Sequence, residues 1–397
     1  MGVTLHLPRR ASALALALGV ALGAAGGIAP VRAATPGAIA DPAGTAAGWV
    51  ATQVASGSLS ASDLDSAIFA LAGAHVGGTA AASALVQLKA SADAYVGYGG
   101  TLKAGALGAV TLAVAVAGGD PTSFNGHNLV ADLRGLLVAS GTDAGVFGDP
   151  TNATIYGQSL DILALAATPG GVPAGAGAWL ANKQCAAGDY SWNGACPVAA
   201  GSEDPDSTAI ALQALLAAGN TAAADKATSW LLGYQSADGS FAAYGDHNAN
   251  STGAAAEALR AAGKAAAADR AAAFLASLQY GCGAAAADRG AIPYTSTNPG
   301  YGGPFSSTAQ AVLGFGAGRL DTLTIAGATA GSPTLSCPVP TATPIAVVRP
   351  APTEPPTDAA VVPAPAGTSS QGTLLLAVAL LALGGALGVG LRAGARR

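Results

Sequence analysis

Apolar positions along the chain fall into short helical segments separated by glycine-rich turns. In the clearest stretch, residues 185–241, a loop and an acidic turn lead to an apolar run from Ala209 to Ala218, which Gly219 ends. A second helical run, from Ala222 to Tyr234, then leads to a loop that begins the same pattern again. The sequence therefore predicts a repeated unit of loop, inner helix, turn and outer helix.

The repeats cover most of the chain. A pair of residues that marks the outer helix returns every 42 to 51 residues: Trp49-Val50, Ala94-Tyr95, Leu136-Leu137, Trp179-Leu180, Trp230-Leu231 and Phe274-Leu275. The inner helix is marked by Asp206-Ser207-Thr208, Asn250-Ser251-Thr252 and Ser306-Ser307-Thr308, and Asp63-Leu64-Asp65-Ser66 is similar to Asp204-Pro205-Asp206-Ser207. We expect an all-α fold of about six helical hairpins over residues 44–330.

Alanine dominates the apolar composition. Hydrophobic residues make up 51% of the chain and charged residues 10%. Alanine favours helices but buries little area per residue, so each helix contact contributes only a modest hydrophobic term. The net charge of -5 argues against a nucleic-acid partner, because nucleic acids bind basic surfaces.

The N-terminal segment has the features of an export signal. Arg9 and Arg10 precede an apolar core, residues 11–29, and Val31-Arg32-Ala33 supplies small residues at a cleavage position. Residues 1–33 are therefore predicted to be a secretory signal peptide. An uncleaved anchor helix is the alternative.

The C-terminal segment is predicted to anchor the protein in the cell membrane. Residues 338–371 contain nine prolines, a composition typical of an extended linker. Residues 373–391 carry no charge and are long enough for one transmembrane helix. The arginines within residues 392–397 favour a cytoplasmic tail, so we expect a single-pass protein whose repeats are extracellular.

The four cysteines are predicted to form two disulfide bonds, because the chain is exported. Cys185 and Cys196 bracket the loop from Gly188 to Trp192, so we pair them, and we pair Cys282 with Cys337. Structural zinc prefers closely spaced cysteine pairs, which this spacing lacks. We therefore predict no metal site.

Two loop motifs resemble those of the prenyltransferase/squalene-cyclase repeat superfamily. They are Gln-x-x-x-Gly-x-x-x-Trp, from Gln184 to Trp192, and Gln-x-x-Asp-Gly-Ser-Phe, from Gln235 to Phe241. Helices that begin Asp-Ser-Thr-Ala strengthen the resemblance, which covers residues 44–330. It implies an α/α toroid, in which inner helices surround a central cavity and outer helices form the rim. Function is a separate question, because unrelated functions share this fold.

The chemistry of class II terpene cyclases has one candidate residue. These enzymes use an Asp-x-Asp-Asp motif whose middle acid protonates an alkene, and Asp204-Pro205-Asp206-Ser207 has serine at the last acidic place. Such a donor must be a carboxylic acid that its surroundings keep protonated. The competing interpretation is that Asp206, Asn250 and Ser306 are N-caps of their helices, since all three residue types cap well.

Two other chemistries of the superfamily lack their residues. A zinc prenyltransferase needs Asp-x-Cys and a distant histidine, but the chain has no Asp-x-Cys, and after the signal peptide only His75, His127 and His247 remain. A thioester domain needs Gly-Cys-Gly-Glu-Gln, and residues 281–285 lack the glutamine. We therefore assign no catalytic residue, metal or cofactor.

The interpretation that remains is a surface module that binds or displays a ligand or partner. Loops that precede the inner helices should meet at one mouth of the cavity, the usual place for a concave ligand site. The expected binding residues there are Trp192, Asp204, Asp206 and His247, and the expected partner is a small apolar ligand or another surface protein. The alternative is an extracytoplasmic terpene-cyclase-like enzyme with Asp206 as proton donor.

Overall fold

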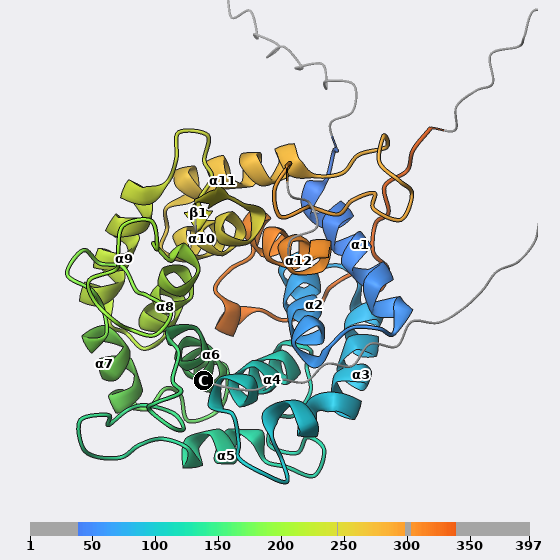
Figure 1. Ribbon diagram of the computed structural model, residues 1–397. Coiled ribbons are helices and arrows are strands. Elements are labelled where there is room, and N and C mark those ends of the chain that lie inside the picture. Colours follow the sequence, from blue (N-terminus) through green and yellow to red (C-terminus); the bar gives the residue numbers. More distant parts are fainter. Residues whose placement is uncertain (1–38, 244, 298–302, 339–397) are drawn as a thin grey trace, which may run out of the picture. The chain divides into compact units, whose positions relative to one another are not determined.

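The computed structural model describes residues 39–243, 245–297 and 303–338, and these residues form an almost entirely helical unit (Figure 1). The predicted all-α class is confirmed. The signal peptide (1–33), the transmembrane segment (373–391), the cytoplasmic tail (392–397) and nearly all of the linker lie outside the described residues. Within the described part, no helix combines the length and the apolar character that crossing a membrane requires.

The described residues contain twelve α-helices, one two-stranded β-hairpin and one short 3-10 helix. The elements are α1 (Pro42–Ser56), α2 (Ala61–Gly73), α3 (Gly78–Val96), α4 (Ala104–Val116), α5 (Leu129–Gly135), α6 (Ile155–Ala166), α7 (Ala174–Asn182), α8 (Pro205–Ala217), α9 (Thr221–Tyr234), β1 (Ala242–Ala243), β2 (Asp246–His247), α10 (Ala249–Ala261), α11 (Ala265–Leu278), α12 (Gly303–Gly316) and η1 (Leu320–Thr322).

Even-numbered helices lie inside and odd-numbered helices lie outside (Figure 1). Helices α2, α4, α6, α8, α10 and α12 contact one another in that order, and α12 also contacts α2. Each outer helix packs against one or more of the inner helices. Five of the six predicted outer-helix markers lie on odd-numbered helices, and the sixth, Leu136-Leu137, directly follows α5.

Glycine lets neighbouring inner helices approach closely. A Cβ atom on Gly105 of α4 would collide with Gly157 of α6, and one on Gly253 of α10 would collide with the backbone of Gln310 on α12. The contact between Gly105 and Gly157 joins the first turns of two inner helices, which therefore run in the same direction. Because side chains on these faces are small, the inner helices pack tightly with little apolar area per residue.

In three of the loops, one glutamine side chain binds the loop to the next outer helix, and we call this contact the glutamine clamp. In each case the side-chain amide nitrogen donates to two carbonyl oxygens, one in its own loop and one in the first turn of an outer helix. The donors and acceptors are Gln184 to Gly188 and Ala223, Gln235 to Gly239 and Ala267, and Gln279 to Gly290 and Pro42, all at 2.9–3.0 Å.

The third glutamine clamp connects the end of the repeats to their beginning. Gln279 follows the last outer helix, α11, whereas Pro42 begins α1, 237 residues earlier. The indole of Trp49, also on α1, donates to the carbonyl oxygen of Ala287 at 2.8 Å. Helix α1 therefore serves as the outer helix of the last repeat.

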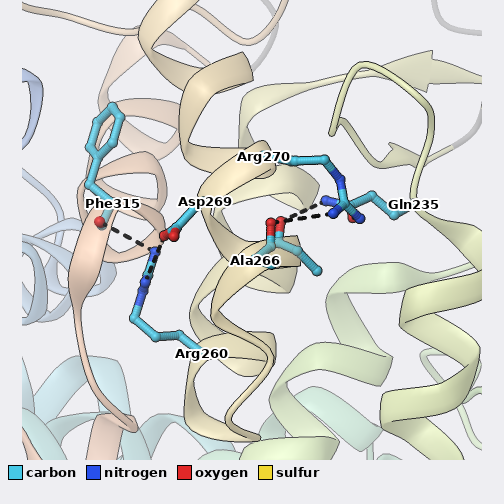
Figure 2. Close-up of polar contacts among 7 residues, drawn as sticks. Gln235, Arg260, Ala266, Asp269, Arg270 and Phe315 are labelled. Atoms are coloured by element: carbon cyan, nitrogen blue, oxygen red, sulfur yellow. Dashed lines mark hydrogen bonds and ion pairs between the residues drawn. The ribbon is translucent and has the colours of Figure 1, made fainter. Parts of the chain in front are cut away.

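A glycine in each of these loops makes the close approach possible. Gly188, Gly239 and Gly290 all have positive φ, and a Cβ on any of them would collide with a backbone carbonyl of the next outer helix. In the second copy, Arg270 of α11 donates to the side-chain oxygen of Gln235 at 2.5 Å, and Figure 2 shows these two residues. That contact leaves the amide nitrogen of Gln235 directed at its two carbonyl acceptors.

The repeated threonines hold the same loops from the other side. Two residues after each glycine, a backbone N–H donates to a threonine hydroxyl on the inner helix. The pairs are Tyr190 with Thr208, Phe241 with Thr252 and Ile292 with Thr308, at 2.9–3.0 Å. In an earlier, degenerate repeat, Gln158 on α6 takes the threonine's place and forms two hydrogen bonds with the backbone of Phe147.

The predicted N-cap positions are wrong by two residues. Asp204, not Asp206, caps α8 by accepting from the N–H of Ser207 at 2.8 Å, and Asn248, not Asn250, caps α10. Ser306 lies inside α12. The Ser-Thr motif recurs because the hydroxyl of its threonine accepts a hydrogen bond from the preceding loop. In the sequence alone, a motif repeated for this tertiary contact looks the same as one repeated for helix capping.

Both predicted disulfides, Cys185–Cys196 and Cys282–Cys337, are present. The second holds the segment that follows the helices. This segment contains η1, which begins at Leu320. After η1, the N–H of Ile325 donates to the carbonyl oxygen of Val116 on α4, and the carbonyl oxygen of Gly331 accepts from the N–H of Gly77. The residues after η1 therefore belong to the helical unit, which extends beyond the predicted limit of residue 330.

We expect Gln279→Ala to lower the free energy of unfolding by about 1–3 kcal/mol, because two hydrogen bonds that join the two ends of the repeats are lost. Gln53→Ala, which removes an exposed glutamine contact on α1, is the control and should change little. Urea denaturation followed by circular dichroism measures both. Equal effects of the two substitutions would contradict a closing role for Gln279.

We expect Asp204→Ala to cost about 0.5–2 kcal/mol, since the N–H of Ser207 loses its cap, whereas Asp204→Asn should be nearly neutral because asparagine caps equally well. The same denaturation assay separates them. Equal losses for alanine and asparagine would show that the charge of Asp204, rather than its capping oxygen, stabilises α8.

Candidate functional site

A cavity of about 140 Å³ lies among the inner helices. All six inner helices contribute through equivalent positions, since the sixth helical residue of α2, α4, α6, α8 and α10 lines it, as does the matching residue of α12. These residues are Ser66, Ala109, Leu160, Ile210, Ala254 and Gln310. The repeat itself therefore generates the cavity, and its chemistry depends on which side chains replace small ones.

Asp65 on α2 is the most unusual residue of the cavity wall. It is 2% exposed, and neither carboxylate oxygen has a hydrogen-bond partner. Burial raises the pKa of Asp65 well above its ordinary value. Ser62 and Ser66 of the same helix also line the cavity, so α2 presents a polar face to it.

Glu257 on α10 is a second buried acid in the wall. It is 2% exposed, and burial raises its pKa to about 8, partly offset by a hydrogen bond from Gln213. Gln213 on α8 in turn accepts from the N–H of Leu320 at 2.9 Å. Because Leu320 also lines the cavity, the segment after α12 helps to enclose it near Glu257.

Aromatic residues complete the wall. Phe69, Tyr95 and Tyr156 line the cavity. Burial, followed by the charges of Asp206 and Glu257, raises the pKa of Tyr156, so its hydroxyl stays neutral. Gln310 forms a hydrogen bond with this hydroxyl, while its own side-chain oxygen has no partner. Among the described residues, no lysine or arginine lines the cavity.

Asp206 does not line this cavity but lies near one of its lining residues, Tyr156. It stands one helical turn before Ile210, so it shares the inward face of α8, and its charge acts on Tyr156. Its carboxylate accepts from the hydroxyl of Ser251 on α10 at 2.7 Å. Burial raises the pKa of Asp206 to about 6, and the neighbouring charge of Asp204 adds to the effect.

The other predicted binding residues lie elsewhere. The side chain of Trp192 is 58% exposed, and its carbonyl accepts from the first N–H of α6. His247 on β2 contacts the hydroxyl of Ser240 at 2.7 Å, and that hydroxyl donates to Asp238. None of the four predicted binding residues, Trp192, Asp204, Asp206 and His247, is among the residues that line the cavity.

Sequence reasoning did not select Asp65 or Glu257. The predicted alignment of Asp63-Asp65 with Asp204-Asp206 was wrong, because Asp65 is the fifth residue of α2, whereas Asp206 is the second residue of α8. Glu257 had a readable signal, since it is the only acid in the alanine-rich run from Ala254 to Ala262. A charge on the inward face of a repeat helix is the feature to look for.

Another buried acid lies outside the cavity. Asp161 on α6 packs against Gly108 of α4 and is not exposed at all. Burial raises its pKa well above the ordinary value.

Among the described residues, no three histidines, cysteines or acids come together as a possible metal site. The chain matches no known protein family and no curated protein.

We expect the stability of the protein to fall as the pH rises from about 4.5 to about 8. Glu257 keeps its proton in the folded state up to pH 8 but loses it near pH 4.5 when unfolded, so unfolding releases a proton between these values and deprotonation favours the unfolded state. The raised pKa values of Asp65, Asp161 and Asp206 act in the same direction.

Glu257→Gln should flatten this dependence and raise stability at pH 8 by an amount on the order of a few kcal/mol, because no charge remains to be buried. Asp225→Asn, on the exposed face of outer helix α9, is the control. Urea denaturation at pH 5 and pH 8 gives the comparison. A wild-type protein that is more stable at pH 8 than at pH 5 would contradict the prediction.

Proposed function

We propose that the protein is an exported, membrane-anchored α/α toroid of the prenyltransferase/squalene-cyclase repeat type, and that its central cavity binds a small ligand. Two observations support the toroid. The inner helices contact one another in a closed order, and the glutamine clamp that joins α9 and α11 to their preceding loops also joins α1 to the last loop. Continuous repeats thus return to their starting point.

The carboxylate of Asp65 is the observation that carries the binding proposal. Burying a polar group without a hydrogen bond is costly, so buried polar groups in folded proteins almost always have partners. Here Asp65 lines a cavity, and neither of its two oxygens has a partner among the described residues. A ligand in that cavity would supply the missing hydrogen bonds, and this gives the unsatisfied group a function.

The two disulfides support the exported location, because disulfides persist in oxidising compartments. The signal peptide and the membrane anchor remain predictions of the sequence. Together they place the cavity outside the cell, where a surface protein meets ligands from the surroundings.

The size of the cavity favours binding over the cyclase-like alternative. Asp206 has the character of an acid, since its pKa of about 6 leaves part of it protonated near neutral pH. However, a cavity near 150 Å³ is filled by a molecule of the size of benzene, and sites for larger organic ligands occupy about 300–1,000 Å³. A cavity of about 140 Å³ is small for folding a long isoprenoid chain.

Native mass spectrometry of the full chain, purified in mild detergent from its own host, tests the proposal. We expect an added mass of a small molecule on the wild-type protein. Ala254→Leu should lose this mass, because the larger side chain fills the cavity, whereas Ala266→Leu, on the exposed face of α11, should keep it. If Ala254→Leu retained the same added mass as the wild-type protein, binding in the cavity would be contradicted.

A further inference from the structure

We propose that the cavity binds a short aliphatic diamine, whose protonated amines pair with Asp65 on α2 and Glu257 on α10. The inference rests on the proposed function and narrows its ligand to one chemical class. It differs from the apolar ligand that the sequence suggests.

The buried side-chain atoms of the cavity wall that lack a partner among the described residues are all oxygens, and they act as hydrogen-bond acceptors once the two acids ionise. They are the two oxygens of Asp65, one oxygen of Glu257 and the side-chain oxygen of Gln310. A ligand that satisfies them must bring donors. An ammonium group has three N–H donors and no acceptor, whereas an anion would bring only more acceptors.

Charge points to the same class. Within the part of the chain that the structure describes, two acids, Asp65 and Glu257, line the cavity, and no lysine or arginine does. The ion pairs found within the described residues, His127 with Asp93, Arg260 with Asp269 and Arg319 with Asp321, involve neither acid of the cavity. A buried acid stays protonated until a positive charge accompanies its carboxylate, and among the described residues no cation is paired with either acid, so a cationic ligand would supply that charge.

The positions of the two acids favour two amines rather than one. Asp65 and Glu257 come from α2 and α10, which lie on either side of α12. Tyr95, Tyr156 and Phe69 supply aromatic surface beside them, and aromatic faces attract organic cations. A metal ion suits this wall poorly, because hard cations take six or more oxygen ligands and the described residues gather no group of three metal-binding side chains.

The volume limits the length of the ligand. A cavity near 150 Å³ accommodates a molecule of the size of benzene, which has six carbon atoms. The cavity of about 140 Å³ therefore suits a molecule of roughly six non-hydrogen atoms. 1,4-Diaminobutane has that size, and 1,4-butanediol and succinate are its neutral and anionic counterparts of similar length.

Isothermal titration calorimetry on the full chain in detergent, freed of any retained molecule by dialysis, tests the inference at pH 7.5. We expect 1,4-diaminobutane to bind, and 1,4-butanediol and succinate to bind at least tenfold more weakly. Asp65→Asn and Glu257→Gln should each weaken diamine binding roughly tenfold or more, because a hydrogen bond to a charged group is lost. Asp225→Asn, on the outer surface, should bind as the wild type does.

Both substitutions preserve shape and leave no buried acid to ionise, so the variants should fold, and their melting curves verify this. Diol binding that equals diamine binding and is abolished by Ala254→Leu would overturn the diamine inference while the cavity keeps its binding function. Diamine affinity unchanged in both Asp65→Asn and Glu257→Gln would also overturn it. Tighter binding of calcium chloride than of the diamine would replace the amine by a metal ion. Failure of all probes, together with no retained mass, would overturn the proposed function as well.

Discussion

The glutamine clamp is the interaction on which the rest of the structure depends. Each copy uses one side-chain amide to hold a loop against the first turn of the following outer helix, and the copy at Gln279 reaches α1. In an open array of helical repeats, the terminal units would expose apolar faces that their neighbours normally cover. Here the final loop binds an outer helix at the start of the chain, and α1 packs against both α12 and α2.

This directional contact matters more because the core consists largely of alanine. Alanine buries little area, so specific hydrogen bonds and the two disulfides carry a larger share of the stability than in a leucine-rich core. Small side chains also bring the inner helices close together, as at Gly105 and Gly253. A ring of closely packed helices leaves a narrow space at its centre, and the small volume of the cavity is thus a consequence of composition.

The sequence predicted the elements better than it predicted the site. Apolar periodicity and the recurring tryptophans located the outer helices, because these features are local. The register of the inner helices was misjudged, since Thr208 and Thr252 are repeated for their bonds to the preceding loops, and a single sequence does not distinguish such a contact from a cap. Asp65 was overlooked for a related reason: its importance comes from the cavity, which five other inner helices line together with α2.

The cavity residues also explain why the segment after α12 belongs to the site. The N–H of Leu320 donates to the side-chain oxygen of Gln213, and Gln213 forms a hydrogen bond with Glu257. A residue that follows the last helix therefore helps to position the wall of the cavity at Glu257. The Cys282–Cys337 disulfide ties the end of that segment to the loop between α11 and α12. Cys282 lies in the same loop as Gln279, so this bond supports both the wall of the cavity and the third glutamine clamp. The chemistry of the site is thereby linked to the oxidising surroundings in which the disulfide persists.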